Sequence, residues 1–308
     1  MDPHRLGLVA TRIHYFQLVA RLGSIRQAAH ALNVAPSSIS RILRQLEDEL
    51  GTPLFERVRQ RLKLTSAGEL MLYHAKASLT ELNRAVSEIN DLHGLHRGTV
   101  SIAVIESVAR GLMPEALQEF WQKHPAISAD VRVMGSQQAV NAVAEGECDL
   151  AVVFDIRVPR NVRRLATISL PLGVLAPPGS RFSDRKELRF FDLAGERVIL
   201  SDGSLTLGAW IEEAFSRSSI DLTRRATTNS IGLMIDLAKR TLGTVLQTRV
   251  GIEEEIATGA LRFVPLRDPR LSPRKLMLLS RSEKEMSDAA LALGKLLIGL
   301  IERLRQDE

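Results

Sequence analysis

Residues 23–51 read GSIRQAAHALNVAPSSISRILRQLEDELG, and this stretch decides the fold of the N-terminal region. Ser24 precedes a segment with helical apolar spacing and is a favoured N-cap residue, so a short helix is expected over residues 25–32. After a brief turn, Pro36 suits the first turn of a second helix, which runs to Leu50 and ends at a glycine. Two short helices joined in this way predict a helix-turn-helix.

The flanking residues add three elements to this motif. Apolar residues on one helical face predict a helix over 13–22, and charged residues that alternate with apolar ones predict a small β-hairpin, or wing, over 57–64. Thr65 or Ser66 then gives the N-cap of a long helix that continues to residue 92. Its apolar stripe must be buried against something, and a partner helix from a second subunit is the simplest expectation.

From residue 98 the pattern changes to strands that alternate with helices, which predicts an α/β domain with a mostly parallel sheet. The length suggests two lobes, and a C-terminal helix over 285–304 is expected to return to the first lobe and close it. The predicted strands are 99–105, 129–134, 149–154, 171–176, 197–200, 223–227, 244–246 and 275–279, and the helices between them are 113–124, 137–145, 207–217 and 231–240.

Charge is distributed unevenly along the chain. Residues 1–66 hold ten Lys/Arg against five Asp/Glu, an excess equal to the net charge of +5 of the whole 308-residue chain. A basic excess confined to one small region is typical of binding to a polyanion, and a solvated basic face is the plainer alternative.

Several function classes lack support in the sequence. No stretch reaches the roughly 18 consecutive apolar residues of a membrane helix, and the N-terminus lacks the apolar core of a signal peptide, so a cytoplasmic protein without membrane contact is expected. Cys148 is the only cysteine, which excludes an intrachain disulfide and a cysteine-based zinc cluster and favours packing in a core. Patterns typical of NTPases, serine hydrolases and zinc proteases are missing, so we expect no enzyme, no metal and no cofactor.

The N-terminal segment closely resembles the DNA-binding region of LysR-type transcriptional regulators. The resemblance rests on matches at fixed spacing, which are GSIRQAA (23–29), LNV (32–34), SSISRI (37–42), LE (46–47), LG (50–51), LFER (54–57) and LTSAG (64–68). It extends more loosely over the rest of the chain through LMP (112–114), EGECDL (145–150) and GTVL (243–246). One departure is Gln247, where many members of the family have proline.

The resemblance implies a fold class and a domain organisation. The fold class is α/β, with a mainly α-helical winged helix-turn-helix at the N-terminus, a long linker helix, and a two-lobed effector domain like that of periplasmic binding proteins. The expected boundaries are 1–66 for the winged helix-turn-helix, 67–97 for the linker and dimerisation helix with its hinge, and 98–308 for the effector domain, with lobe 1 at about 98–165 and 268–308 and lobe 2 at about 166–267.

The family pattern also implies which residues meet double-stranded DNA. A recognition helix places its N-terminal residues at base edges in the major groove, and short serine side chains permit a close approach. Cations on the wing and at the start of the preceding helix suit phosphates. Arg41 is open to a guanine or a phosphate contact, and Arg57 to a phosphate or an internal ion pair. The candidate DNA-binding residues are Ser24, Arg26, Pro36, Ser37, Ser38, Ser40, Arg41, Arg44, Arg57, Arg59, Arg61 and Lys63.

In the effector domain the resemblance implies a cleft at strand ends and helix N-termini, where free backbone N–H groups favour anions. The candidate effector-binding residues are Ser107, Ser136, Gln137, Asp202, Asn229 and Ser230. Each of them suits an ordinary N-cap or turn equally well. Glu106 and Arg110 flank Ser107, and from charge alone they suggest a zwitterionic or amine-bearing ligand.

Together these features predict a DNA-binding transcription factor that a small-molecule co-inducer gates through lobe closure. Its expected partners are promoter DNA, the effector, RNA polymerase and further copies of the chain, as a dimer or a tetramer. A ligand-independent DNA-bridging protein remains an alternative, since it needs only the basic head and an oligomer. A solute-binding or transport protein shares the two-lobed domain, but it normally carries an export signal and no basic winged helix.

Overall fold

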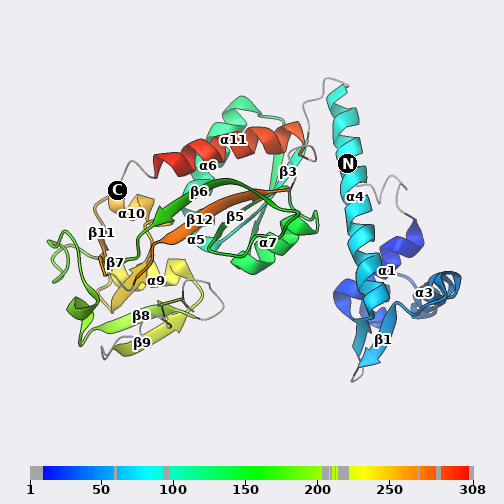
Figure 1. Cartoon of the computed structure of the whole chain (residues 1–308), viewed down its shortest axis with the longest axis horizontal. Coiled ribbons are helices and arrows are strands. Elements are labelled where there is room, and N and C mark those ends of the chain that lie inside the picture. The colour runs from blue at the N-terminus through cyan, green and yellow to red at the C-terminus, as the bar shows by residue number, and fades with distance from the viewer. Residues whose placement is uncertain are drawn as a thin grey trace. The chain divides into compact units, whose positions relative to one another are not determined.

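The computed structural model describes residues 10–58, 61–92, 98–202, 208, 210, 211, 213, 222–268, 271–281 and 286–304 (Figure 1). The chain divides near residue 95 into an N-terminal and a C-terminal compact unit. Among the described residues, no helix is both long and apolar enough to cross a membrane.

The N-terminal unit is a winged helix-turn-helix that continues into a long helix. Its elements are α1 (Thr11–Leu22), α2 (Ile25–Leu32), α3 (Pro36–Leu50), β1 (Phe55–Val58), β2 (Arg61–Leu64) and α4 (Ser66–Leu92). The Oγ of Ser24 accepts a hydrogen bond from the Gln27 amide, and Asn33 adopts a left-handed conformation with φ of 52° between α2 and α3. The predicted helix-turn-helix is therefore confirmed, including the bounds of α2 and α3.

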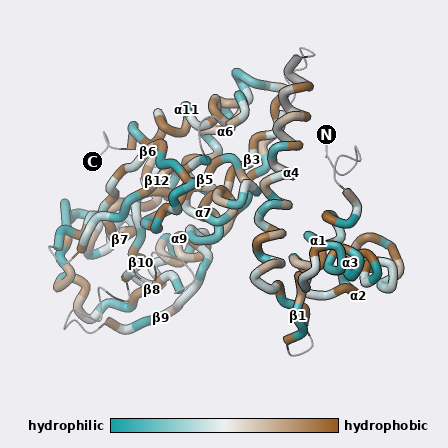
Figure 2. The backbone as a smooth tube through the Cα atoms, turned by 45° about the vertical axis from the view of Figure 1, so that its right-hand side comes forward, coloured by the Kyte–Doolittle hydropathy of each residue, from teal (hydrophilic) through white to brown (hydrophobic). Residues whose placement is uncertain are grey.

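One hydrophobic core holds this unit together. Phe16, Ile39 and Leu54 are almost completely buried in it, and the first turns of α4 pack against it. In the colouring of Figure 2, hydrophobic and hydrophilic stretches alternate along these helices, as amphipathic helices around a core require. Of the two predicted N-caps of α4, Thr65 is the one used, because its Oγ1 accepts a hydrogen bond of 3.1 Å from the Gly68 amide.

The C-terminal unit begins with a five-stranded sheet whose strand order is β4-β3-β5-β12-β6. Its strands are β3 (Thr99–Val104), β4 (Ser128–Val133), β5 (Leu150–Phe154), β6 (Arg163–Leu170) and β12 (Arg274–Ser280), and its helices are α5 (Glu106–Arg110), α6 (Leu112–Lys123), α7 (Ser136–Ala144) and α11 (Asp288–Arg303). β3 pairs in parallel with β4 and β5, whereas β12 runs antiparallel to β5 and β6.

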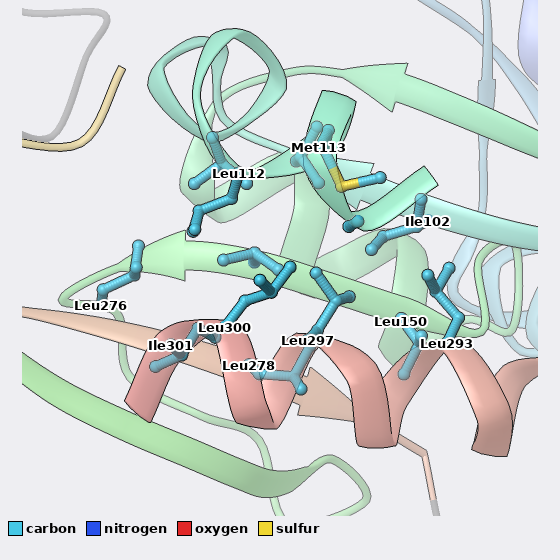
Figure 3. Close-up of a cluster of buried hydrophobic side chains, with 14 of the residues drawn as sticks. Ile102, Leu112, Met113, Leu150, Leu276, Leu278, Leu293, Leu297, Leu300 and Ile301 are labelled. Atoms are coloured by element: carbon cyan, nitrogen blue, oxygen red, sulfur yellow. The ribbon is translucent and has the colours of Figure 1, made fainter. Parts of the chain in front are cut away.

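Helices cover both faces of this first sheet. Because side chains alternate along a strand, Ile102 and Leu150 face one side, where they pack with α6 and α11. Figure 3 shows this layer, in which Leu293 and Leu297 of α11 reach the strand residues. The opposite side packs against α7, and Cys148 is buried in that cluster as expected. The C-terminal helix therefore returns to the first lobe, as predicted.

A second five-stranded sheet has the order β11-β7-β10-β8-β9. Its strands are β7 (Gly173–Ala176), β8 (Arg197–Ser201), β9 (Thr223–Thr228), β10 (Thr244–Gln247) and β11 (Arg262–Pro265), and it is accompanied by the 3-10 turn η1 (Phe190–Leu193) and the helices α9 (Ile231–Lys239) and α10 (Glu253–Ala257). β8, β9 and β10 are parallel, and β7 pairs antiparallel with β10 and β11.

Each sheet is mostly parallel, as predicted, and one strand in each, β12 and β7, runs antiparallel to the other four. The structure differs from the sequence-based expectation in the elements that the sequence did not predict. Strand β6 was not predicted, and because it pairs with β12, the chain leaves the first lobe after Leu170 and not near residue 165. α5, α10 and β11 were also missed. The predicted hinge over 94–97 and most of the helix predicted over 207–217 lie outside the described residues.

Candidate functional site

One face of α3 is polar, exposed and rich in potential donors. Ile39, Leu43 and Leu46 are buried in the core of the N-terminal unit. Ser37, Arg41 and Arg44 follow one another at helical spacings of four and three on the opposite, exposed face. Pro36 is also exposed at the start of the helix, whereas Ser38 and Ser40 are half-buried beside it.

The wing is fixed next to this helix by backbone hydrogen bonds. The Oε1 of Glu47 in α3 accepts hydrogen bonds from the amides of Leu54 and Phe55, at 2.7 and 3.1 Å. The Leu62 amide of β2 donates to the Gly23 carbonyl at 3.1 Å. The cations of the wing are therefore held near the start of α2, where Ser24 is engaged as the N-cap.

Six of the predicted DNA-binding cations lie on the surface without an ion-pair partner among the residues that the structure describes. Within the described residues, no ion pair is formed by Arg26, Arg41, Arg44, Arg57, Arg61 or Lys63, and all six are exposed. By contrast, Arg12 of the same unit pairs with Glu49. Arg59 lies outside the described residues. Unpaired cations gathered on a helix-turn-helix and its wing present a positive surface to a polyanion.

In the C-terminal unit, the carboxyl ends of the two parallel strand sets meet. Glu106 follows β3 of the first sheet, and its Oε1 accepts hydrogen bonds from three groups at the start of α9, which belongs to the second sheet. These are the Ile231 amide at 2.9 Å, the Gly232 amide at 3.3 Å and the Ser230 hydroxyl at 3.3 Å. The positive N-terminal end of α9 is therefore occupied by a carboxylate of the protein itself.

Arg110, one turn further along α5, forms a second link between the lobes. Its Nε donates to the Gly251 carbonyl at 2.9 Å, and its guanidinium also pairs with Glu255. Lys239 lies 3.2 Å from the same carboxylate. Burial alone would raise the pKa of Glu255, but the two cations hold the pKa below its ordinary value. Glu106 and Arg110 thus serve internal contacts.

The backbone between these links is closely packed. Gly251 has φ of +95°, and a Cβ added to it would lie 2.9 Å from the Ser107 carbonyl oxygen, so a larger residue would push α5 away. The nearby Glu253 is half-buried, and desolvation raises the pKa of its carboxyl group above 4.5 although the Gly251 amide donates to it at 2.8 Å. A carboxylate in such a place destabilises the fold when it is charged.

Two buried hydroxyl groups at these strand ends lack partners. The Oγ of Ser201, the last residue of β8, and the Oγ1 of Thr248, just after β10, have no hydrogen-bond partner among the residues that the structure describes. Gln247, the last residue of β10, is buried, and its Oε1 accepts a hydrogen bond from the Thr248 amide at 3.0 Å. A buried polar group without a partner is costly, so a bound ligand or water is the ordinary means of satisfying it. Sequence reasoning missed both hydroxyls, because an isolated serine or threonine carries no pattern.

The six predicted effector-binding residues have different surroundings. Ser230 is the N-cap of α9 and contacts Glu106. Ser107 is buried in α5, and the buried Ser136 accepts a hydrogen bond from the Phe154 amide at 3.3 Å. Gln137 donates a hydrogen bond to Asn141 on the surface of α7, and the Asp202 amide donates to the Thr228 carbonyl. Asn229 is exposed. All six follow the carboxyl end of a strand.

Both units match family profiles. Residues 10–69 match the profile described as "Bacterial regulatory helix-turn-helix protein, lysR family", and residues 93–300 match "LysR substrate binding domain". The chain therefore belongs to the LysR family of transcriptional regulators and is a DNA-binding regulator with a substrate-binding domain.

Relatives and solved structures agree with this assignment. A "Probable RuBisCO transcriptional regulator" of Trichormus variabilis is 26% identical over 298 residues, which cover 94% of this chain and 88% of the relative. The "Uncharacterized HTH-type transcriptional regulator YybE" of Bacillus subtilis is 27% identical over 209 residues, covering 68% and 72% of the two chains. The fold is similar to that of a full-length OxyR variant from Pseudomonas aeruginosa, with a TM-score of 0.67, 17% identity and 93% of each chain covered. Full-length BenM gives a TM-score of 0.54 at 23% identity, with 95% of this chain and 96% of BenM covered.

Proposed function

We propose that this regulator is gated by a small polar effector that binds where the carboxyl ends of the two sheets meet. The observation that carries the proposal is the pair of buried hydroxyls of Ser201 and Thr248, which have no partner among the described residues and follow strands β8 and β10 at the same edge of the sheet from which β9 leads into α9 and the Glu106 contact. The effector satisfies these hydroxyls and shifts the arrangement of the lobes, which alters how the DNA-binding heads engage a promoter. The six sequence-predicted effector residues remain candidates for the same site.

A thermal-shift screen against a metabolite panel tests this function. A ligand at a hundred times its dissociation constant stabilises the fold by about 2.7 kcal/mol, which corresponds to roughly 5–11 °C for a unit of this size. Thr248→Val is the sharpest variant, because removing a buried hydroxyl without a partner leaves the ligand-free protein at least as stable as before. Its response to a hit should fall sharply. An equal response in both proteins places the ligand elsewhere, and a panel without any hit favours the ligand-independent bridging alternative.

The DNA-binding mode that we propose follows from the exposed face of α3. Ser37, Ser40 and Arg41 read base edges in the major groove, and Arg26 with the wing cations contacts phosphates. As a regulator of transcription the protein then acts in the cytoplasm together with RNA polymerase.

Dimerisation through α4 is the remaining part of the proposal. Leu70 and Ile89 on this helix are 61% and 53% exposed, so part of its apolar stripe is not covered within the subunit. A second copy of the helix buries these side chains and brings two recognition helices to a partly palindromic site. In sedimentation experiments, Leu70→Glu combined with Ile89→Glu should shift the protein toward the monomer, whereas the control Gln118→Glu combined with Gln122→Glu, at two exposed positions of α6, should not. An unchanged mass in the double variant would locate the interface elsewhere.

A further inference from the structure

A second cavity lies away from the Ser201 and Thr248 hydroxyls. It has a volume of about 620 Å³, within the range of small-molecule sites. Leu170 and Pro171 line it at the crossover from the first lobe to the second, and Pro265 and Pro273 line it at the crossover back. The cavity therefore adjoins both segments that connect the two lobes.

The wall of this cavity is apolar. Leu170, Val250 and Leu261 are almost completely buried behind it, and the half-buried ring of Phe263 completes it. The ring of Phe263 lies directly over Gly173, where an added Cβ would come within 2.5 Å of two ring atoms. The aromatic ring is thus held in place, and the wall suits the apolar body of a small molecule.

Four cations surround the same cavity, and no acid lines it among the residues that the structure describes. They are Lys186, Arg249, Arg262 and Arg267. Two of them form long ion pairs with exposed carboxylates, since Arg262 lies 3.9 Å from the fully exposed Asp184 and Arg267 lies 3.8 Å from the exposed Glu187. Exposed pairs at such distances contribute little and leave the positive field largely in place.

We propose that this cavity binds a small organic anion with an apolar body. The acid group lies among the cations, and the body contacts Phe263 and the leucine side chains. Because such a ligand touches both crossovers, it favours one arrangement of the lobes and acts as a second input beside the effector site. The site does not depend on the effector proposal, since Ser201 and Thr248 do not line it.

Octanoate and octylammonium are suitable probes, because they share an apolar chain and carry opposite charges. Displacement of a fluorescent anilinonaphthalene sulfonate from the full-length protein, below the micelle concentrations, reports their binding. We expect octanoate to displace the dye and octylammonium to leave it bound. Equal displacement by both probes, or none by octanoate, would overturn the proposal.

Two variants with equal loss of charge locate the site. Arg262→Gln combined with Arg267→Gln should raise the Kd of octanoate at least tenfold, which is about 1.4 kcal/mol. The control combines Arg163→Gln with Arg164→Gln, two exposed positions at the start of β6 that do not line the cavity, and should leave the Kd within twofold. Equal weakening in both double variants would show general charge attraction and refute a defined site.

A steric variant checks the location independently of charge. Ser169 is exposed on β6 at the edge of the cavity, so Ser169→Trp introduces a bulky ring there without removing a buried group. It should abolish displacement by octanoate while the protein still binds DNA. Undiminished octanoate binding in this variant would place the anion elsewhere.

Discussion

Replacement of Glu106 by glutamine tests whether a carboxylate of the first lobe holds the second lobe. Glutamine keeps a carbonyl oxygen that accepts from the Ile231 amide, which lies 2.9 Å from the carboxylate, but it removes the negative charge at the start of α9. Hydrogen bonds to a charged group contribute about 1.5–3 kcal/mol and neutral ones about 0.5–1.5 kcal/mol. The Gly232 and Ser230 contacts, at 3.3 Å each, add less.

We therefore expect Glu106→Gln to lower the free energy of unfolding by about 1–2 kcal/mol. For a unit of 150–250 residues this corresponds to a decrease in Tm of about 2–8 °C. Glu106→Ala should be more destabilising, because it leaves the amides at the start of α9 without their acceptor. Acetate should restore part of the Tm of the alanine variant by occupying the same amides, and chloride at equal ionic strength should not.

Differential scanning calorimetry on the full chain measures both variants. Glu119→Gln is the matched control, since that carboxylate is exposed on α6 and pairs only with surface cations, and its Tm should be unchanged. A decrease below 1 °C for Glu106→Gln, or an equal decrease for the control, would refute the assignment of Glu106 as a link between the lobes.

Three further predictions concern the DNA-binding unit, the Glu253 carboxyl group and the hydrophobic core of the first lobe. If Arg41 reads a base, Arg41→Ala should weaken operator binding by about 1–3 kcal/mol and relax specificity at one position. If Arg41 binds a phosphate, the variant should instead reduce the dependence of log affinity on log salt concentration by about one. Fluorescence anisotropy over a salt series distinguishes the two, with Arg12→Ala, which removes an ion-paired arginine, as the control. Glu253→Gln should stabilise the protein at pH 7, because the raised pKa of the native carboxyl group means that its ionised form costs stability. This advantage should shrink as the pH falls through the raised pKa and be absent below 4.5, and urea unfolding at pH 7 and at a pH below 4.5 measures it. Leu297→Ala should cost about 2–5 kcal/mol in urea unfolding, more than the half-buried Leu296→Ala.

The helix-turn-helix could be predicted residue by residue because its signals are local. The caps at Ser24, Pro36 and Gly51 each act within a turn of the helix that they delimit. Strand β6 could not be predicted, because it begins with two exposed arginines and its partner β12 begins only at Arg274. Its pairing is decided by contacts between distant parts of the chain, which no short window contains.

The candidate effector residues were likewise predictable only in part. The family resemblance implied a cleft at strand ends, and all six candidates follow the carboxyl end of a strand. The roles of Glu106 and Arg110 were not predictable, since their partners lie 124 or more positions later in the chain. Glu106 next to Ser107 suggested a ligand contact. In the fold, the Glu106 carboxylate instead accepts hydrogen bonds from the free amides at the N-terminus of α9.

The contact of Glu106 with α9 restricts the ways in which an effector can act where the two lobes meet. A ligand shifts an arrangement only by the difference in its affinity for the two states, and α5 contributes both Glu106 and Arg110 to the links between the lobes. An anionic effector that binds the N-terminus of α9 has to displace Glu106. The protein then loses the hydrogen bonds of Glu106, and the free energy gained on effector binding is reduced by that loss. A polar effector that binds Ser201 and Thr248 leaves the link intact and adds its own contacts to the same arrangement. The anionic ligand separates the lobes, so Glu106→Gln should increase its affinity. The ligand of Ser201 and Thr248 holds the lobes together, so Glu106→Gln should decrease its affinity, and the direction of the change distinguishes the two modes of gating.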